Sequence, residues 1–194
     1  MSPDPVWTRR VLLTLTVWLL VASGVGLLGL YEGAPAPVIG ATNAVLVALT
    51  LIAVVRIRGL RTWAEAVSLR PLVLYHLVRF VGIAFLVLYA RGVIPGAFAL
   101  VAGWGDIAVA VLAIPAALLC VPVSTRARWW GLLAWNAFGL ADILLVLGNG
   151  MRLGLADIAE MAWITVFPWT LLPTFIVPLV ITTHVWIFVR LWRL

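Results

Sequence analysis

The sequence has no lysine, one cysteine, two histidines and little charge of any kind. Only 10% of its 194 residues are charged, against roughly 25% in a typical soluble domain. The single cysteine, Cys120, excludes an intrachain disulfide and a metal site built from several cysteines. No nucleotide-binding loop is present, which excludes ATP-driven transport by this chain alone. A serine or cysteine nucleophile is nearly excluded, because Ser23 is the only serine within a long apolar run and Cys120 lies at the edge of one.

Continuous apolar sequence is what the chain has in abundance. Hydrophobic residues make up 65% of it, in runs of about 20 residues that suit membrane helices, whereas barrel strands alternate over roughly 10 residues. The sequence therefore predicts an all-α polytopic membrane helix bundle, and we interpret residues 1–194 as a single transmembrane domain. Six transmembrane helices are expected near residues 11–30, 39–55, 71–90, 95–120, 129–147 and 168–189. The segment 151–166 is expected to be an interfacial helix with Asp157 and Glu160 facing water.

The arginines predict the orientation of these helices. Ten of them fall at one set of helix ends, and only Arg91 and Arg152 fall at the other. By the positive-inside rule, both termini are expected to be cytoplasmic. The apolar run after Arg9 and Arg10 is longer than that of a signal peptide, so we interpret it as a retained first helix. The expected partner is the lipid bilayer rather than a nucleic acid, and a homo-oligomer or a partner in a membrane complex stays open.

Several polar side chains lie within the predicted spans, where each costs several kcal/mol unless it is partnered. They are His76, Arg79, Asp106, Asn136, Asp142 and His184. A helical rise of about 1.5 Å per residue places the two histidines, Asn136 and Arg79 about 8–12 Å from the cytoplasmic ends, and both aspartates about 20 Å. The sequence thus predicts an inner tier of histidines, asparagine and arginine, and an outer tier of two aspartates.

The charges in this group do not balance. Arg79, Asp106 and Asp142 sum to −1 if all are ionised and both histidines are neutral, and an unbalanced buried charge is costly. One aspartate therefore holds a proton, or a histidine is charged, or a cation or cationic ligand completes the site. The alternative interpretation is structural: Arg79 extends toward the membrane surface or binds helix carbonyls, and each aspartate hydrogen-bonds a neighbouring helix.

The sixth span contains three prolines at intervals of five residues. Within a helix, Pro173 would free the carbonyl of Trp169 and Pro178 that of Thr174. A freed carbonyl in a membrane needs a new partner, which a side chain, water or ligand can supply. Pro173 and Pro178 are therefore the candidate hinge, and a simple kink is the competing interpretation.

Spans three to six carry four sequence patterns: R-x-x-G, G-x-G-D, W-N-x-x-G-x-x-D and P-x-x-x-x-P-x-x-x-x-x-H. Their residues are Arg79, Gly82, Gly103, Gly105, Asp106, Trp135, Asn136, Gly139, Asp142, Pro173, Pro178 and His184. These patterns resemble those of a family of small bacterial six-helix membrane proteins, and the resemblance covers about two-thirds of the chain. It implies a fold, a polar site and a bacterial inner membrane, but no reaction.

Two narrower hypotheses each propose a specific activity or cofactor for these residues. The letters GWGD, ending at Asp106, are similar to the signature of intramembrane aspartyl proteases, in which Asp106 and Asp142 would be the catalytic pair. The chain departs from that signature because the partner aspartate follows GxGD, lies in GLAD, and has no convincing PAL motif after it. Alternatively, His76 and His184 could be the axial ligands of a b-type haem.

We expect a ligand or ion site formed by Arg79, Asp106, Asn136, Asp142 and His184. No metal site is expected, and apart from the haem hypothesis the sequence does not identify a cofactor. The working function is binding or transport of a proton, a cation or a small ligand. An accessory or structural membrane subunit is the alternative, and the sequence favours a non-enzymatic role over the peptidase.

Overall fold

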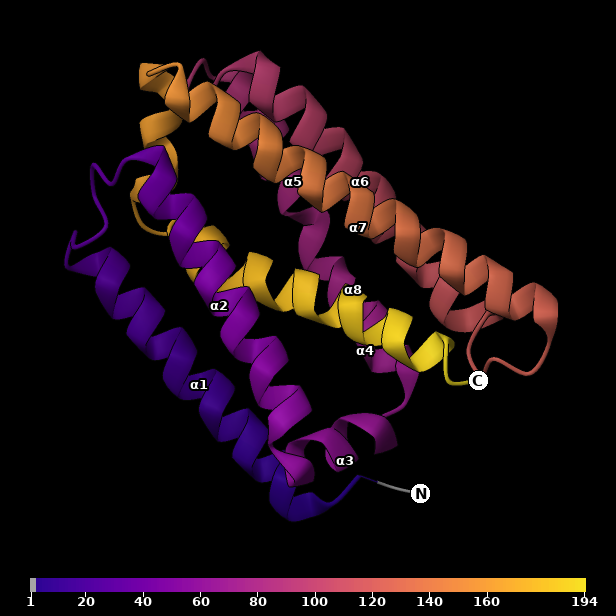
Figure 1. Ribbon diagram of the computed structural model, residues 1–194. Helices are drawn as coiled ribbons and strands as arrows, with labels where there is room; N and C mark the ends of the chain where they lie inside the picture. The colour runs from indigo at the N-terminus through magenta and orange to yellow at the C-terminus, as the bar shows by residue number, and fades with distance from the viewer. Residues whose placement is uncertain (1–2) are drawn as a thin grey trace. The chain divides into compact units, whose positions relative to one another are not determined.

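The computed structural model describes residues 3–194, and all regular structure in that range is helical (Figure 1). Its α-helices are α1 (Pro5–Leu27), α2 (Ala36–Arg56), α3 (Arg58–Ala66), α4 (Leu69–Tyr75), α5 (Val81–Ala90), α6 (Gly96–Leu119), α7 (Arg126–Leu155) and α8 (Val177–Leu191). Within residues 3–194, six helical stretches are long and apolar enough to cross a membrane. Two of them are compound: α4 continues into α5, and a π-helical turn precedes α8. For the residues described, the predicted all-α class and its six long apolar helices are confirmed.

The start of the first span and the end of the fifth differ most from their predicted positions. Helix α1 begins at Pro5 because Asp4 caps it, accepting a hydrogen bond of 2.8 Å from the backbone N–H of Val6. Helix α7 continues past Gly148 and Gly150 to Leu155, instead of ending near residue 147. Asn149 holds this part of α7 in place by donating a 2.7 Å hydrogen bond to the carbonyl of Ala97 on α6.

The segment 151–166 does not form one interfacial helix. Its first residues complete α7, Asp157 adopts a left-handed backbone with φ 54°, and a 3₁₀ turn covers Ala159–Thr165. Asp157 and Glu160 are nevertheless exposed, as expected.

The third long stretch is interrupted at its centre. Helices α4 and α5 are joined by a 3₁₀ turn, His76–Phe80, which contains both His76 and Arg79. A 3₁₀ turn rises about 2.0 Å per residue, roughly 0.5 Å more than an α-helix, so it carries Arg79 further along the axis than an unbroken helix would.

The chain divides into two compact units, Met1–Ser68 with Ala162–Thr182, and Leu69–Met161 with Thr183–Leu194. The interpretation of residues 1–194 as a single transmembrane domain stays a prediction.

In the first unit, the backbone carbonyls around Pro173 and Pro178 have other hydrogen-bond donors in place of the N–H groups that proline lacks. A π-helical turn spans Leu172–Ile176, and the N–H of Val177 bonds back to the carbonyl of Leu172 rather than to that of Pro173. The side-chain amide of Asn43 lies 3.4 Å from the Pro173 carbonyl, to which it donates. The indole N–H of Trp18 donates to the Thr174 carbonyl at 2.8 Å, which Pro178 leaves without its helical donor.

The carbonyl freed by Pro173 is also bonded. The Trp169 carbonyl accepts the backbone N–H of Leu172 at 2.9 Å, as in a 3₁₀ turn. Short turns and side-chain donors from α1 and α2 therefore satisfy the backbone around both prolines.

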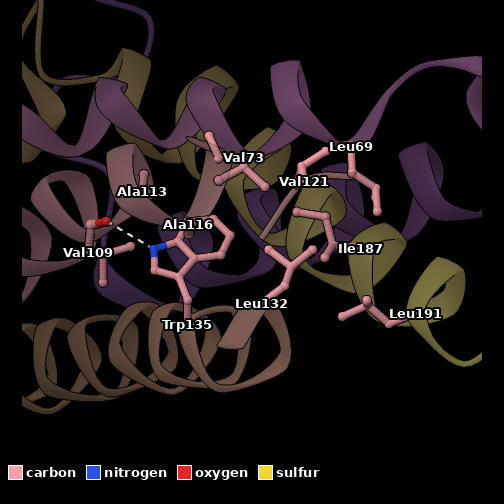
Figure 2. Packing of buried hydrophobic residues seen from close by; sticks show 11 residues of the cluster. Leu69, Val73, Val109, Ala113, Ala116, Val121, Leu132, Trp135, Ile187 and Leu191 are labelled. Carbon is pink, nitrogen blue, oxygen red and sulfur yellow. Dashed lines mark hydrogen bonds between the residues drawn. The ribbon is translucent and has the colours of Figure 1, made fainter. Parts of the chain in front are cut away.

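In the second unit, α6 and α7 run side by side (Figure 1). A hydrophobic core forms at one end of the unit where α4, α6, α7 and the last part of α8 meet (Figure 2). Val73, Val109, Leu132 and Ile187 are fully buried there. Trp135 lies in this core beside Val109 and Ala116, and its indole N–H donates to the carbonyl of Val109 at 3.2 Å (Figure 2).

Candidate ion-paired site in the second unit

Arg79 is the centre of the polar site in the second unit. Its side chain is 2% exposed, and three of its nitrogens donate to acceptors on two other helices. Nε donates to Oδ1 of Asp106 on α6 at 2.6 Å, and Nη1 donates to the carbonyl of Gly139 on α7 at 2.8 Å. Nη2 donates to Oδ2 of Asp142, also on α7. One guanidinium therefore joins two carboxylates that lie on adjacent helices.

Glycines allow the helices to approach closely around this group. A Cβ on Gly82 of α5 would lie 2.5 Å from the Gly103 carbonyl and 2.8 Å from Cβ of Asp106, so only glycine fits without displacement. A Cβ on Gly105 would overlap Oδ1 of Asp142. These two glycines therefore let the helices approach closely beside both aspartates.

The two carboxylates differ in exposure. The Asp106 side chain is 5% exposed and the Asp142 side chain is 11% exposed. The carboxylate of Asp142 is therefore more accessible from outside the protein than that of Asp106.

A second polar group surrounds the two histidines, which are fully buried. Nδ1 of His184 lies 2.8 Å from Oδ1 of Asn136, and the Asn136 amide donates to the His184 carbonyl at 3.0 Å. Because that amide oxygen can only accept, His184 carries its proton on Nδ1. Nε2 of His76 lies 3.2 Å from the hydroxyl of Thr183. The remaining ring nitrogens, Nδ1 of His76 and Nε2 of His184, have no hydrogen-bond partner among residues 3–194.

The two polar groups meet at Gly139. Its carbonyl accepts from Arg79, and a Cβ on it would lie 2.5 Å from Cε1 and 2.8 Å from Nε2 of His184. The expected separation into two tiers is therefore wrong for Arg79, which was placed with the histidines and instead reaches both aspartates. The 3₁₀ turn moves Arg79 along the helix axis, and its long side chain covers the rest of the distance.

Five of the expected site residues thus lie in one unit and form two adjoining groups: Arg79, Asp106, Asn136, Asp142 and His184. The candidate hinge residues Pro173 and Pro178 belong to the first unit, in the π turn described above. Their role as a hinge stays a prediction, as does the binding role of the site residues.

Three side chains that bond these groups were not predicted from the sequence: Trp18 and Asn43 at the proline turn, and Thr183 beside His76. Asn43 is buried within an apolar helix, and the criterion that singled out Asn136 would have found it. Thr183, the partner of His76, carries no comparable signal, because threonine is common in membrane helices and usually bonds its own backbone.

The geometry also bears on the two narrower hypotheses. The rings of His76 and His184 stack with centroids 4.0 Å apart and planes tilted by 37°, so a porphyrin does not fit between them as it would between axial ligands. An aspartyl peptidase needs its carboxylates to share a water or a proton. Here both carboxylates are bonded to the same guanidinium.

Across residues 3–194, the regular structure is all helical, with six long apolar helices and a buried arginine–dicarboxylate group. Residues 36–192 match the family model described as a domain of unknown function (DUF8737), and the chain belongs to that family. The matched range contains both polar groups and the proline turn. No curated protein and no solved structure matches the chain.

Proposed function

We propose that this chain is a multi-pass membrane protein that binds one exchangeable proton, or a small cation in its place, at Arg79, Asp106 and Asp142. Both termini lie on the cytoplasmic side of a bacterial inner membrane in this proposal. The observation that carries it is the single buried guanidinium shared by two carboxylates. Such intramembrane groups mark proton and ion pathways in many membrane proteins.

The charge balance supports a bound positive charge. One arginine and two ionised aspartates leave the group at −1, and an uncompensated charge in a low-dielectric interior costs several kcal/mol. A proton on one carboxyl, or a cation beside it, removes that cost. The same requirement would be met if a histidine were charged.

Hydrogen bonding argues against a charged histidine. An imidazolium donates from both nitrogens, and one nitrogen of each ring has no acceptor among residues 3–194. The proton or cation is therefore assigned to the carboxylates, and Asp142, the more exposed of the two, is the point of exchange.

Proton movement across reconstituted membranes tests this function. The purified protein would be placed in liposomes that contain a pH-sensitive dye, and the internal pH followed after an external acid jump. We expect Asp142→Asn to lower the protein-dependent proton flux at least about tenfold, the effect of about 1.4 kcal/mol on the proton-bound state. Asp157→Asn is the matched control, because Asp157 is exposed at the end of the same helix. Equal fluxes from the wild type and Asp142→Asn would contradict the proposal.

A structural role is the second candidate, and the closure of the Arg79 network favours it. Three of its nitrogens already have protein acceptors, so the group can hold the 3₁₀ turn between α4 and α5 against α6 and α7 without a ligand. Melting Asp106→Asn and Asp142→Asn in detergent separates the candidates. A proton site relieved of charge imbalance keeps or gains stability in both variants, whereas a purely structural network loses stability in both.

A further inference from the structure

A second surface lies at one end of the first unit, where α1 begins and α2 and α3 meet. We propose that this surface binds the headgroup of an anionic phospholipid, whose acyl chain follows α1 along Leu12 and Leu13. The proposal rests on the membrane location proposed above and does not depend on the proton site.

The surface is held together by tryptophan contacts between α1 and α3. The indole N–H of Trp63 donates to the hydroxyl of Thr8 at 2.9 Å. The ring of Trp7 lies against Gly59 so closely that a Cβ on that glycine would overlap it. The guanidinium of Arg10 stacks over the same ring, 5.0 Å from its centroid. Helix α3 is thereby fixed against the start of α1.

This arrangement gathers positive charge. Exposed arginines on this end come from all three helices: Arg9, Arg10, Arg56, Arg58 and Arg61. Among the described residues of α1, α2 and α3 and the Asp4 cap, the acidic ones are Asp4 and Glu65, so the five arginines leave this surface basic. Guanidinium groups bind phosphate oxygens in a planar, bidentate geometry, which suits a phosphodiester headgroup.

On the C-terminal side of Arg9, α1 presents an exposed apolar face, which we call the apolar track, that contains Leu12 and Leu13. A shallow groove of about 460 Å³ runs along α1 past Arg9, Leu12, Leu13 and Thr16. These residues follow the i, i+3, i+4, i+7 spacing of one helix face, so the groove descends about 10 Å from the arginine. Leu12 and Leu13 are more than half exposed. A charged group above an exposed apolar track matches a phospholipid and does not match a nucleic acid, which would leave the leucines in water.

Lipid retention by the purified full-length chain tests the proposal. The protein in neutral detergent would be titrated with phosphatidylglycerol or with phosphatidylcholine of the same acyl chains, and bound lipid counted by native mass spectrometry. We expect the wild type to prefer phosphatidylglycerol. Each of Arg9→Gln and Arg10→Gln should weaken that preference about fivefold, the usual effect of one arginine near an anionic surface.

Three controls test whether lipid binding depends on the position of the arginine, on its charge and on the acyl chains. Arg91→Gln and Arg152→Gln remove exposed arginines elsewhere and should leave the preference unchanged. Arg9→Lys keeps the charge and should retain most of the binding even if the glutamine variants fold poorly. Glycerol phosphate, which has the headgroup but no chains, should not displace the lipid. Equal binding of both lipids, equal losses in the controls, displacement by glycerol phosphate, or arginine-dependent binding of a short DNA strand would each overturn the proposal.

Discussion

At the scale of single residues, Arg79 determines the chemistry of the second unit. A lysine has one ammonium group, whereas the planar guanidinium of Arg79 reaches two carboxylates and a backbone carbonyl on different sides. The sequence alone identified Arg79, Asp106 and Asp142 as candidate site residues, because they are charged residues within apolar runs. It did not predict that Arg79 reaches both aspartates, because this depends on a local 3₁₀ turn that has no clear sequence signal.

Replacing Arg79 by methionine should be strongly destabilising. The variant leaves two carboxylates side by side without their counter-charge, which costs about 3–5 kcal/mol. Unfolding in detergent by denaturant titration measures the loss. Arg91→Met, an exposed arginine outside the network, should change the free energy of unfolding by less than about 0.5 kcal/mol. Similar effects of the two substitutions would show that the Arg79 network contributes little.

The glycine beside Asp142 gives a second test at this scale. In Gly105→Ala the new methyl group would overlap Oδ1 of Asp142, so we expect a loss of about 1–3 kcal/mol from overpacking. Gly148→Ala, on α7, meets open space and should be neutral or stabilising by up to about 1 kcal/mol, as expected for alanine in a helix. Thermal melts of both variants provide the comparison, and a stabilised Gly105→Ala would contradict the packing described.

At the scale of elements, the turn before α8 shows what a proline pattern can and cannot predict. The spacing of Pro173 and Pro178 predicted carbonyls in need of partners, because proline has no N–H to donate. It could not identify Trp18 and Asn43 as donors, since both lie more than 100 residues away in the chain. Nor did it predict the π turn, which shifts one backbone hydrogen bond from Pro173 to Leu172.

The Trp18 bond can be removed while most of the ring is kept. Trp18→Phe deletes the N–H that reaches the Thr174 carbonyl, so we expect a loss of about 1–3 kcal/mol for an acceptor left without this donor. Trp104→Phe is the matched control, because Trp104 is 62% exposed on α6. The two free energies of unfolding, measured in the same detergent, should differ clearly. If they agree, the indole bond does not stabilise the turn.

At the scale of the whole molecule, composition was the strongest predictor. Six apolar runs predicted six long helices because the apolar length that spans a bilayer is a global property and needs no knowledge of packing. Helix ends were predicted less well, since α7 continues through glycines that a tertiary hydrogen bond holds in place. The division into two units depends on long-range contacts that the sequence pattern does not contain.

The orientation of the helices is a prediction at this scale. The arginine distribution places both termini in the cytoplasm and the loop containing Arg91 outside. In a Cys120→Ala background, a membrane-impermeant thiol reagent added to intact cells should label Arg91→Cys and leave Asp4→Cys and Arg193→Cys unlabelled. Labelling of either terminal position would reverse or break the proposed topology.

The protonation of the Arg79 group is the most direct test of the proposed function. Infrared spectroscopy at neutral pH, in buffer without alkali metal cations, detects the C=O stretch of a protonated carboxyl and its shift in D₂O. The other five acidic residues are exposed, so a buried carboxyl should be distinguishable from them. We predict one such band, which disappears in both Asp106→Asn and Asp142→Asn, since either change balances the charge, and persists in Asp157→Asn. A wild type without the band, or a band that survives in both variants, would contradict the account.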